Sequence, residues 1–233
     1  MSENGRPQLT VIVPAYNERA TILEVIERLR ALPFTRQIIV VDDCSVDGTD
    51  EVLRGVGDDV EVLRHDVNQG KGAALRTGFA QARGHVVVVQ DADLEYDPVD
   101  IPALIAPILE GHADVVYGSR LIGGKPQRVH LFWHKAGNRF LSLLTNVLYN
   151  TTLTDMETGY KAFTLEVLRA IEPLRESDFR IEPELTAKIC RGRFRVYELP
   201  ISYYGRSYDE GKKITWKDGF PAAWALVKYR FRD

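Results

Sequence analysis

Cysteine is scarce in this sequence. Only Cys44 and Cys190 occur among 233 residues, and they lie far apart. Disulfide-stabilised folds and cysteine-ligated zinc sites need clustered cysteines, so neither class is indicated. We therefore expect the protein to reside in a reducing, cytoplasmic compartment.

Long apolar runs and a strong charge of one sign are also lacking. The most apolar long segment, 131–149, is interrupted by polar and basic residues and falls short of the roughly 20 apolar residues of a membrane span. Residues 1–8 lack the apolar core of a signal peptide. The formal net charge of −3 argues against a general nucleic-acid binder. We expect a protein that binds no nucleic acid and does not cross a membrane, though it can lie on one.

Two common nucleotide-binding motifs are missing as well. Gly70-Lys71-Gly72 lacks the earlier glycine and the following Ser or Thr of a phosphate-binding P-loop, and no GxGxxG occurs. We interpret this glycine-rich stretch as the start of a helix, and contact between Lys71 and a ligand stays open.

What is present is an alternation of apolar runs and amphipathic segments. Hydrophobic residues make up 45% of the chain and charged residues 27%, which is typical of a globular protein with a substantial core. Strands alternating with helices predict an α/β fold with a mostly parallel sheet flanked by helices, which we expect to form a single domain over 1–233. Expected strands cover 9–13, 38–41, 60–63, 86–89, 115–117, 159–163 and 195–199. Expected helices cover 22–32, 70–82 and 182–191, with a short helix that Thr49 caps and two amphipathic helices near 131–149 and 216–230.

Acidic or turn-forming stretches follow three of the expected strands. They are Pro14 to Glu18, Asp42-Asp43 and Asp91-Ala92-Asp93. In a doubly wound sheet the carboxyl ends of these strands meet at one edge, where such folds bind ligands. Asp-x-Asp alone is also common turn chemistry, but the convergence of three stretches favours a site for Mg²⁺ or Mn²⁺, held by Asp91 and Asp93 with a nucleotide diphosphate.

Several motifs, in this order, resemble one known family: VIVPAYNE, VDDCSVDGT, NQGKGAALRTG, QDADLEYDP, YGSR, TDMETGYKAF and YGRSYDEGKKI. The chain is similar to the family 2 glycosyltransferases of GT-A fold, whose Rossmann-like βαβ units bind nucleotides. Within that family it most resembles the polyprenyl-phosphate hexosyltransferases, the dolichol-phosphate mannosyltransferase group. The resemblance covers roughly residues 8–220.

The resemblance implies a role for each matching residue. Asp91 and Asp93, with Ala92 between them, would bind the metal and through it the diphosphate; Asp155 would lie on the acceptor side. The remaining residues divide between the nucleoside (Pro14, Tyr16, Glu18, and Asp42 or Asp43) and the donor or acceptor phosphates (Arg120, Arg206, and Lys212 or Lys213).

The resemblance also implies an inverting reaction. A hexose would move from a nucleotide sugar, GDP-mannose first or else a UDP-hexose, to a polyprenyl phosphate at the cytosolic membrane face. One alternative is transfer to a saccharide or other soluble hydroxyl with Asp155 as the general base. A non-catalytic nucleotide-sugar-binding protein is a further alternative, and a sugar-nucleotide pyrophosphorylase is disfavoured because PAYNE replaces its N-terminal loop.

The end of the sequence bears on membrane attachment. Many relatives continue into membrane-spanning helices, whereas this sequence ends at Asp233, so we expect no integral anchor. The aromatic and basic residues near 131–149 and 216–230 are expected to contact lipid headgroups, a small membrane-anchoring subunit, or only the protein's own sheet.

Overall fold

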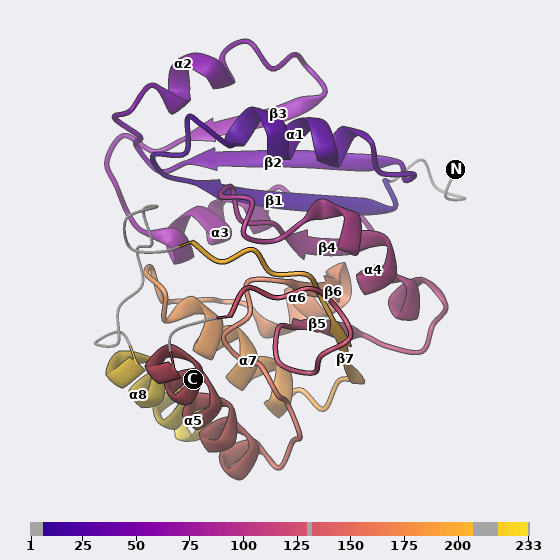
Figure 1. Cartoon of the computed structure of the whole chain (residues 1–233), viewed down its shortest axis with the longest axis vertical. Coiled ribbons are helices and arrows are strands. Elements are labelled where there is room, and N and C mark those ends of the chain that lie inside the picture. Colours follow the sequence, from indigo (N-terminus) through magenta and orange to yellow (C-terminus); the bar gives the residue numbers. More distant parts are fainter. Residues whose placement is uncertain (1–6, 130–131, 207–218, 233) are drawn as a thin grey trace.

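The computed structural model describes residues 7–129, 132–206 and 219–232. Its described residues form one seven-stranded sheet in the order β3-β2-β1-β4-β6-β5-β7 (Figure 1). Only β6 runs antiparallel to its neighbours, so the expected mostly parallel α/β sheet is confirmed. The strands are β1 (Leu9–Ala15), β2 (Arg36–Asp42), β3 (Val60–Arg64), β4 (Val86–Val89), β5 (Val115–Ser119), β6 (Lys161–Thr164) and β7 (Val196–Pro200).

Helices cover both faces of this sheet. One face packs against α1 (Ile22–Arg30), α2 (Thr49–Leu53) and α4 (Ile101–Leu109), which a 3₁₀ turn, η1 (Pro98–Asp100), precedes. The other face packs against α3 (Lys71–Ala80), α6 (Leu165–Ile171) and α7 (Ile181–Arg191). Each face therefore has its own hydrophobic core, and β4 is buried on both sides because all four of its valines are enclosed.

The register of the central strands decides where the acidic stretches meet. Ala15 at the end of β1 lies opposite Asp42 at the end of β2. On the other side of β1, Ile12 lies opposite Val89, and the amide of Gln90 donates a hydrogen bond to the Ile12 carbonyl. The chain leaves β1, β2 and β4 at the same edge of the sheet, as the sequence predicts.

Two further helices lie outside the two layers. The helices α5 (Phe132–Tyr149) and α8 (Gly219–Phe231) pack side by side and against α7 (Figure 1). The hydroxyl of Tyr149 donates a hydrogen bond of 2.6 Å to the Leu226 carbonyl between them. The helix expected over 131–149 is confirmed; α8 matches the helix expected near 216–230, although residues 216–218 lie outside the described part. Within that part, no helix combines the length and apolar character that crossing a bilayer would require.

Two helices, α4 and α6, are not predicted by the sequence. The segment of α4 contains Pro102 and Pro107, which usually end helices. Pro102 sits in the first turn, where its missing N–H is not needed, and Pro107 is near the last turn. The short helix α6 begins where the Thr164 side chain caps the Val167 amide at 3.1 Å.

Candidate active site

Two carboxylates follow β4 in a tight loop. Asp91 Oδ1 lies 2.8 Å from Lys71 Nζ, at the first turn of α3. The same ammonium group lies 3.4 Å from Glu182 Oε1 on α7. Asp93 Oδ1 accepts a hydrogen bond of 3.0 Å from the Glu95 amide. Lys71 thus contacts the acidic loop directly, and its contact with a ligand stays a prediction.

The electrostatics of this loop fit a divalent cation. Shielding from water, together with the negative charges of Asp91 and Glu95, raises the pKa of Asp93 to about 7. Burial alone would lower the pKa of Lys71, but the charges of Asp91 and Glu182 raise it above its ordinary value. No group of three or more His, Cys, Asp or Glu side chains in the described ranges is arranged around a metal position. A metal held by Asp91 and Asp93 would need further oxygen ligands, of the kind that a bound diphosphate offers.

Gly159, after the loop that carries Asp155, lies directly against the carboxylate of Asp91. A Cβ atom at Gly159 would lie 2.5 Å from Asp91 Oδ2, and the Gly159 amide donates a hydrogen bond of 3.0 Å to the Tyr96 hydroxyl. Only glycine fits here without moving the carboxylate. The acidic loop and the segment before β6 are therefore in direct contact.

Asp42 and Asp43 have different environments at the end of β2. Both oxygens of Asp43 are occupied: they accept hydrogen bonds from the amides of Gln69 and Gly70 at 2.9 and 2.7 Å, and His65 Nδ1 lies 2.7 Å from Oδ1. Asp42 Oδ1 accepts from the Ser45 amide at 3.1 Å, whereas its buried Oδ2 accepts no hydrogen bond. Asp43 therefore holds the loop that leads to Lys71, whereas Asp42 Oδ2 has only a long ion pair, 3.5 Å from Arg64 Nε.

The turn after β1 is joined to the acidic loop by Arg206. Glu18 Oε2 lies 3.1 Å from an Arg206 terminal nitrogen, which also donates a hydrogen bond to the Asp93 carbonyl. The backbone amide of Glu18 donates a hydrogen bond of 3.0 Å to Thr49 Oγ1, which holds this turn against α2. Pro14, near the end of β1, and Tyr16, in the turn, are half-buried, and buried Ala92 accepts a hydrogen bond of 2.7 Å from the Thr21 hydroxyl. Lys212 and Lys213 lie outside the described residues.

Arg120 and Asp155 form a second charged centre, across Tyr96 from the acidic loop. Arg120 Nε and Nη2 donate to the two Asp155 oxygens, each at 2.7 Å, and the Arg120 amide adds a bond of 2.9 Å. Asn138 of α5 donates to the same carboxylate at 2.8 Å. Burial would raise the pKa of Asp155, but the Arg120 charge and these donors hold it below its usual range. The Arg120 guanidinium lies 6.0 Å from the centre of the Tyr96 ring.

A family model for glycosyl transferase family 2 matches residues 10–171, well over half of the chain. The chain belongs to glycosyl transferase family 2. It is therefore a glycosyltransferase, and its sheet is that of the GT-A fold, as the resemblance implies.

Relatives and solved structures agree with this family. An undecaprenyl-phosphate mannosyltransferase of Micrococcus luteus is 32% identical over 88% of this chain and 87% of its own length. A UDP-N-acetylglucosamine-dolichyl-phosphate N-acetylglucosaminyltransferase of Methanococcus voltae is 28% identical over 93% of this chain and 94% of its own. Glucosyl-3-phosphoglycerate synthase of Mycobacterium tuberculosis, solved with Mn²⁺, UDP and phosphoglyceric acid, superposes with a TM-score of 0.74 at 21% identity, over 98% of this chain and 80% of that one.

This family 2 glycosyltransferase also contains acids near the site that sequence reasoning misses. Glu157 Oε1 and Glu182 Oε1 are buried and accept no hydrogen bond, and Glu182 Oε2 accepts one from Lys161 Nζ. Burial raises the pKa of Glu157 to about 7; the charge of Lys161 opposes this shift and that of Glu182 adds to it. Glu95, which accepts a hydrogen bond from the Arg206 amide, could have been found from the sequence, because it lies two residues after Asp93. Glu182 could not, because it reaches the site only through the packing of α7.

Proposed function

We propose that this glycosyltransferase moves a hexose from a nucleotide sugar to a polyprenyl phosphate with inversion at the sugar carbon. Mannose from GDP-mannose is the first choice and a UDP-hexose the second. The two relatives named above, one a mannosyltransferase and the other a user of UDP-N-acetylglucosamine, both act on polyprenyl phosphates and support this acceptor class. Because the acceptor's hydrocarbon chain stays in a bilayer, the reaction would take place at a membrane surface, and we propose the cytosolic face.

The donor would bind at the edge formed by the ends of β1, β2 and β4. Asp42 would accept a hydrogen bond from the nucleoside, with the half-buried Pro14 and Tyr16 beside it. Asp91 and Asp93 would hold Mg²⁺ or Mn²⁺, which when bound neutralises charge on the departing diphosphate. Arg206, already joined to Glu18 and the Asp93 carbonyl, keeps the two sides of this edge together.

The environment of Asp155 supports this acceptor class. This carboxylate is fully buried, both of its oxygens accept hydrogen bonds from Arg120, and its pKa is lowered. A general base must be able to accept the proton it removes, and the two hydrogen bonds from Arg120 and the lowered pKa of Asp155 both disfavour that role. An acceptor that needs no base, such as a phosphate whose oxygen is already anionic, fits this centre. Arg120 then supplies a positive charge that Asp155 orients.

A hydroxyl acceptor remains a second candidate because of Glu157. It has a buried carboxylate oxygen that accepts no hydrogen bond, and its pKa is raised to about 7, a value suited to a general base near neutral pH. In that case Glu157 would take the role that the sequence suggested for Asp155, since the two oxygens of Glu182 contact the ammonium groups of Lys71 and Lys161.

Transfer of radiolabel to an organic-extractable product tests the proposal. GDP-mannose and UDP-hexoses would be offered in turn with a polyprenyl phosphate and Mn²⁺. We expect lipid-linked sugar from one donor, its loss on addition of EDTA, and little product from Asp91→Asn. The absence of lipid product with every common donor would contradict the acceptor assignment.

A further inference from the structure

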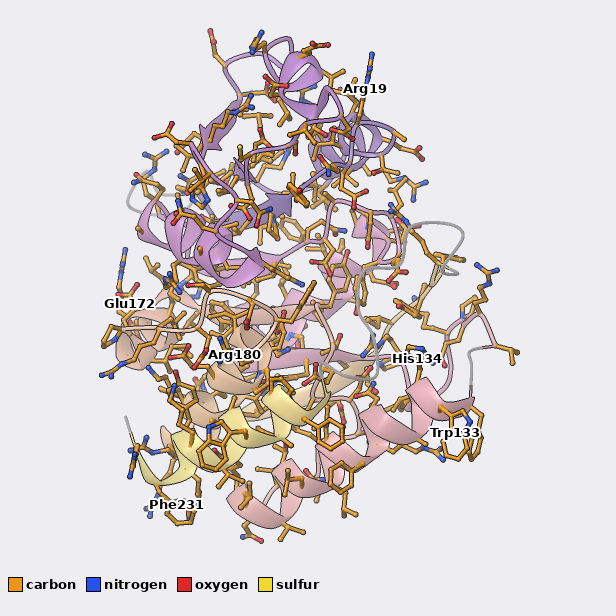
Figure 2. The ribbon with its side chains drawn as sticks, turned by 90° about the vertical axis from the view of Figure 1, so that its left-hand side faces the viewer. Arg19, Trp133, His134, Glu172, Arg180 and Phe231 are labelled. Atoms are coloured by element: carbon orange, nitrogen blue, oxygen red, sulfur yellow. The ribbon has the colours of Figure 1, made fainter. Side chains whose placement is uncertain are left out.

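An exposed apolar surface runs along the two helices that lie outside the sheet layers. We define the α5–α8 face by Trp133, Phe140, Leu143 and Val147 of α5 together with Trp224 and Phe231 of α8. The exposed fractions of Trp133, Phe140 and Trp224 are 78%, 59% and 66%. Trp133 and Phe231 lie at opposite ends of the helix pair (Figure 2). An apolar surface of this extent is unusual for a protein surface that contacts only water.

The side chains of this face share one side of each helix. At about 100° per residue, the four α5 members fall within an arc of about 80°, and Leu141 and Thr145, which are buried, lie on the opposite side. On α8, Trp224 and Phe231 are seven positions apart and project together, while Ala225 and Tyr229 are buried beneath them. Each helix therefore has two apolar sides. One packs on the protein and the other faces outward.

The charges on these two helices are all of one sign. Neither α5 nor α8 contains an aspartate or glutamate. Exposed Lys135 and Arg139 flank the apolar stripe of α5, and exposed Arg230 lies on α8 with its guanidinium 5.8 Å from the centre of the Tyr149 ring. The whole chain has a formal net charge of −3, so positive charge is concentrated here. A second copy of this chain would bring like charges together, whereas anionic lipid headgroups complement them.

The same helix reaches the acceptor side of the site. Asn138 of α5 donates to Asp155, which holds Arg120. A hollow of about 280 Å³ is lined by Arg139 and Leu143 of α5 and by Leu121, the residue after Arg120. The apolar stripe lies on one side of α5, and Arg120 is connected to the opposite side of the same helix through Asp155 and Asn138.

We propose that the α5–α8 face docks on the surface of a bilayer that contains anionic lipids. The aromatic rings enter the boundary between headgroups and acyl chains, and Lys135, Arg139 and Arg230 contact lipid phosphates. Docking on this side brings Arg120 toward the membrane surface, where a polyprenyl phosphate presents its headgroup. This last step rests on the proposed acceptor; the docking itself does not.

Co-sedimentation of the whole chain with vesicles tests the docking. Vesicles of phosphatidylcholine alone and vesicles with about a third phosphatidylglycerol would be compared. We expect binding to the anionic vesicles, reduced at least tenfold by Trp133→Ser combined with Phe140→Ser, and reduced on anionic vesicles by Lys135→Gln combined with Arg139→Gln. Val99→Ser, at an exposed valine of η1, is the matched control and should bind like the unaltered protein. Circular dichroism would verify that each variant is folded.

A second readout separates docking from catalysis. With a short water-soluble isoprenyl phosphate as acceptor, the Trp133/Phe140 variant should match the unaltered protein, and it should lose activity only on polyprenyl phosphate embedded in vesicles. If the unaltered protein transfers sugar to neither acceptor yet binds vesicles, the proposed reaction fails and the docking stands. Lack of binding to anionic vesicles, or binding that the α5 variants leave unchanged, would overturn the docking. A dimer in light scattering that becomes a monomer in the Trp133/Phe140 variant would assign the face to a second copy and overturn it as well.

Discussion

Arg120 binds the buried carboxylate of Asp155 through two parallel hydrogen bonds of 2.7 Å, although the two residues are 35 positions apart. The pair is enclosed, since the Asp155 side chain is fully buried and that of Arg120 is only 16% exposed. A bidentate arrangement of this kind fixes the plane of the guanidinium as well as its position. Asp155 thus acts as the residue that positions Arg120.

Replacing Asp155 by Asn should destabilise the protein strongly. The change leaves the Arg120 charge buried without its partner, which typically costs about 3–5 kcal/mol. The free energy of unfolding from urea titration measures the effect. Asp114→Asn is the matched control, because Asp114 forms a similar pair with Arg195 at the surface and its loss should cost at most about 1 kcal/mol. Equal losses in the two variants would contradict the buried pair.

Glu157 should make the protein less stable as the pH rises. Its pKa is about 7 in the folded protein and about 4.3 in an unfolded chain, so the folded state holds a proton that the unfolded state releases between these values. The free energy of unfolding therefore falls as the pH rises from about 4 to 7. Glu157→Gln should reduce this slope, leaving the part that Asp93 contributes through its own raised pKa, and should raise the melting temperature at pH 8. An unchanged pH dependence of the melting temperature would show that Glu157 is ionised in the folded protein.

Gly159→Ala should weaken binding of Mn²⁺ with a nucleoside diphosphate by at least tenfold. The added methyl group would lie 2.5 Å from Asp91 Oδ2 and displace a carboxylate that we assign to the metal. Isothermal titration calorimetry measures the affinity. Gly137→Ala on α5, where a Cβ atom meets nothing within 4 Å, serves as control and should leave the affinity unchanged. Unchanged affinity in Gly159→Ala would contradict the assignment of Asp91 as a metal ligand.

Asp42→Asn and Asp43→Asn should separate binding from stability. Asp42 Oδ2 accepts no hydrogen bond and has only a long ion pair, 3.5 Å from the half-exposed Arg64 Nε, so its replacement should weaken nucleoside diphosphate binding with a small change in melting temperature. Asp43 holds the loop before α3, so its replacement should lower the melting temperature by several degrees, since each 1 kcal/mol is worth roughly 2–4 °C in a chain of this size. The reverse pattern would assign the nucleoside to Asp43.

The acidic edge could be predicted from the sequence because its signals are local. Four consecutive valines indicate β4, and the position of Asp91 at the end of that strand follows directly. The carboxyl ends of β1 and β2 are marked in the same way, by apolar runs that stop at Pro14 and Asp42.

The partners of these residues could not be predicted, because they arise from packing between distant segments. Nothing near Lys71 in the sequence indicates that Glu182 of α7 lies beside it, or that Asn138 of α5 bonds to Asp155. The distinction between Asp42 and Asp43 has the same origin, since it depends on the loop at 69–70 closing over one of the two carboxylates.

The most direct test of the phosphate acceptor compares two lipids that differ only in that group. The protein would be given its donor and Mn²⁺ with either a polyprenyl phosphate or the matching polyprenol. Because Asp155 is occupied by Arg120 and has a lowered pKa, we predict sugar transfer to the phosphate and at least a hundredfold slower transfer to the alcohol. Comparable transfer to the polyprenol would show that a general base operates in this site, and would contradict the account.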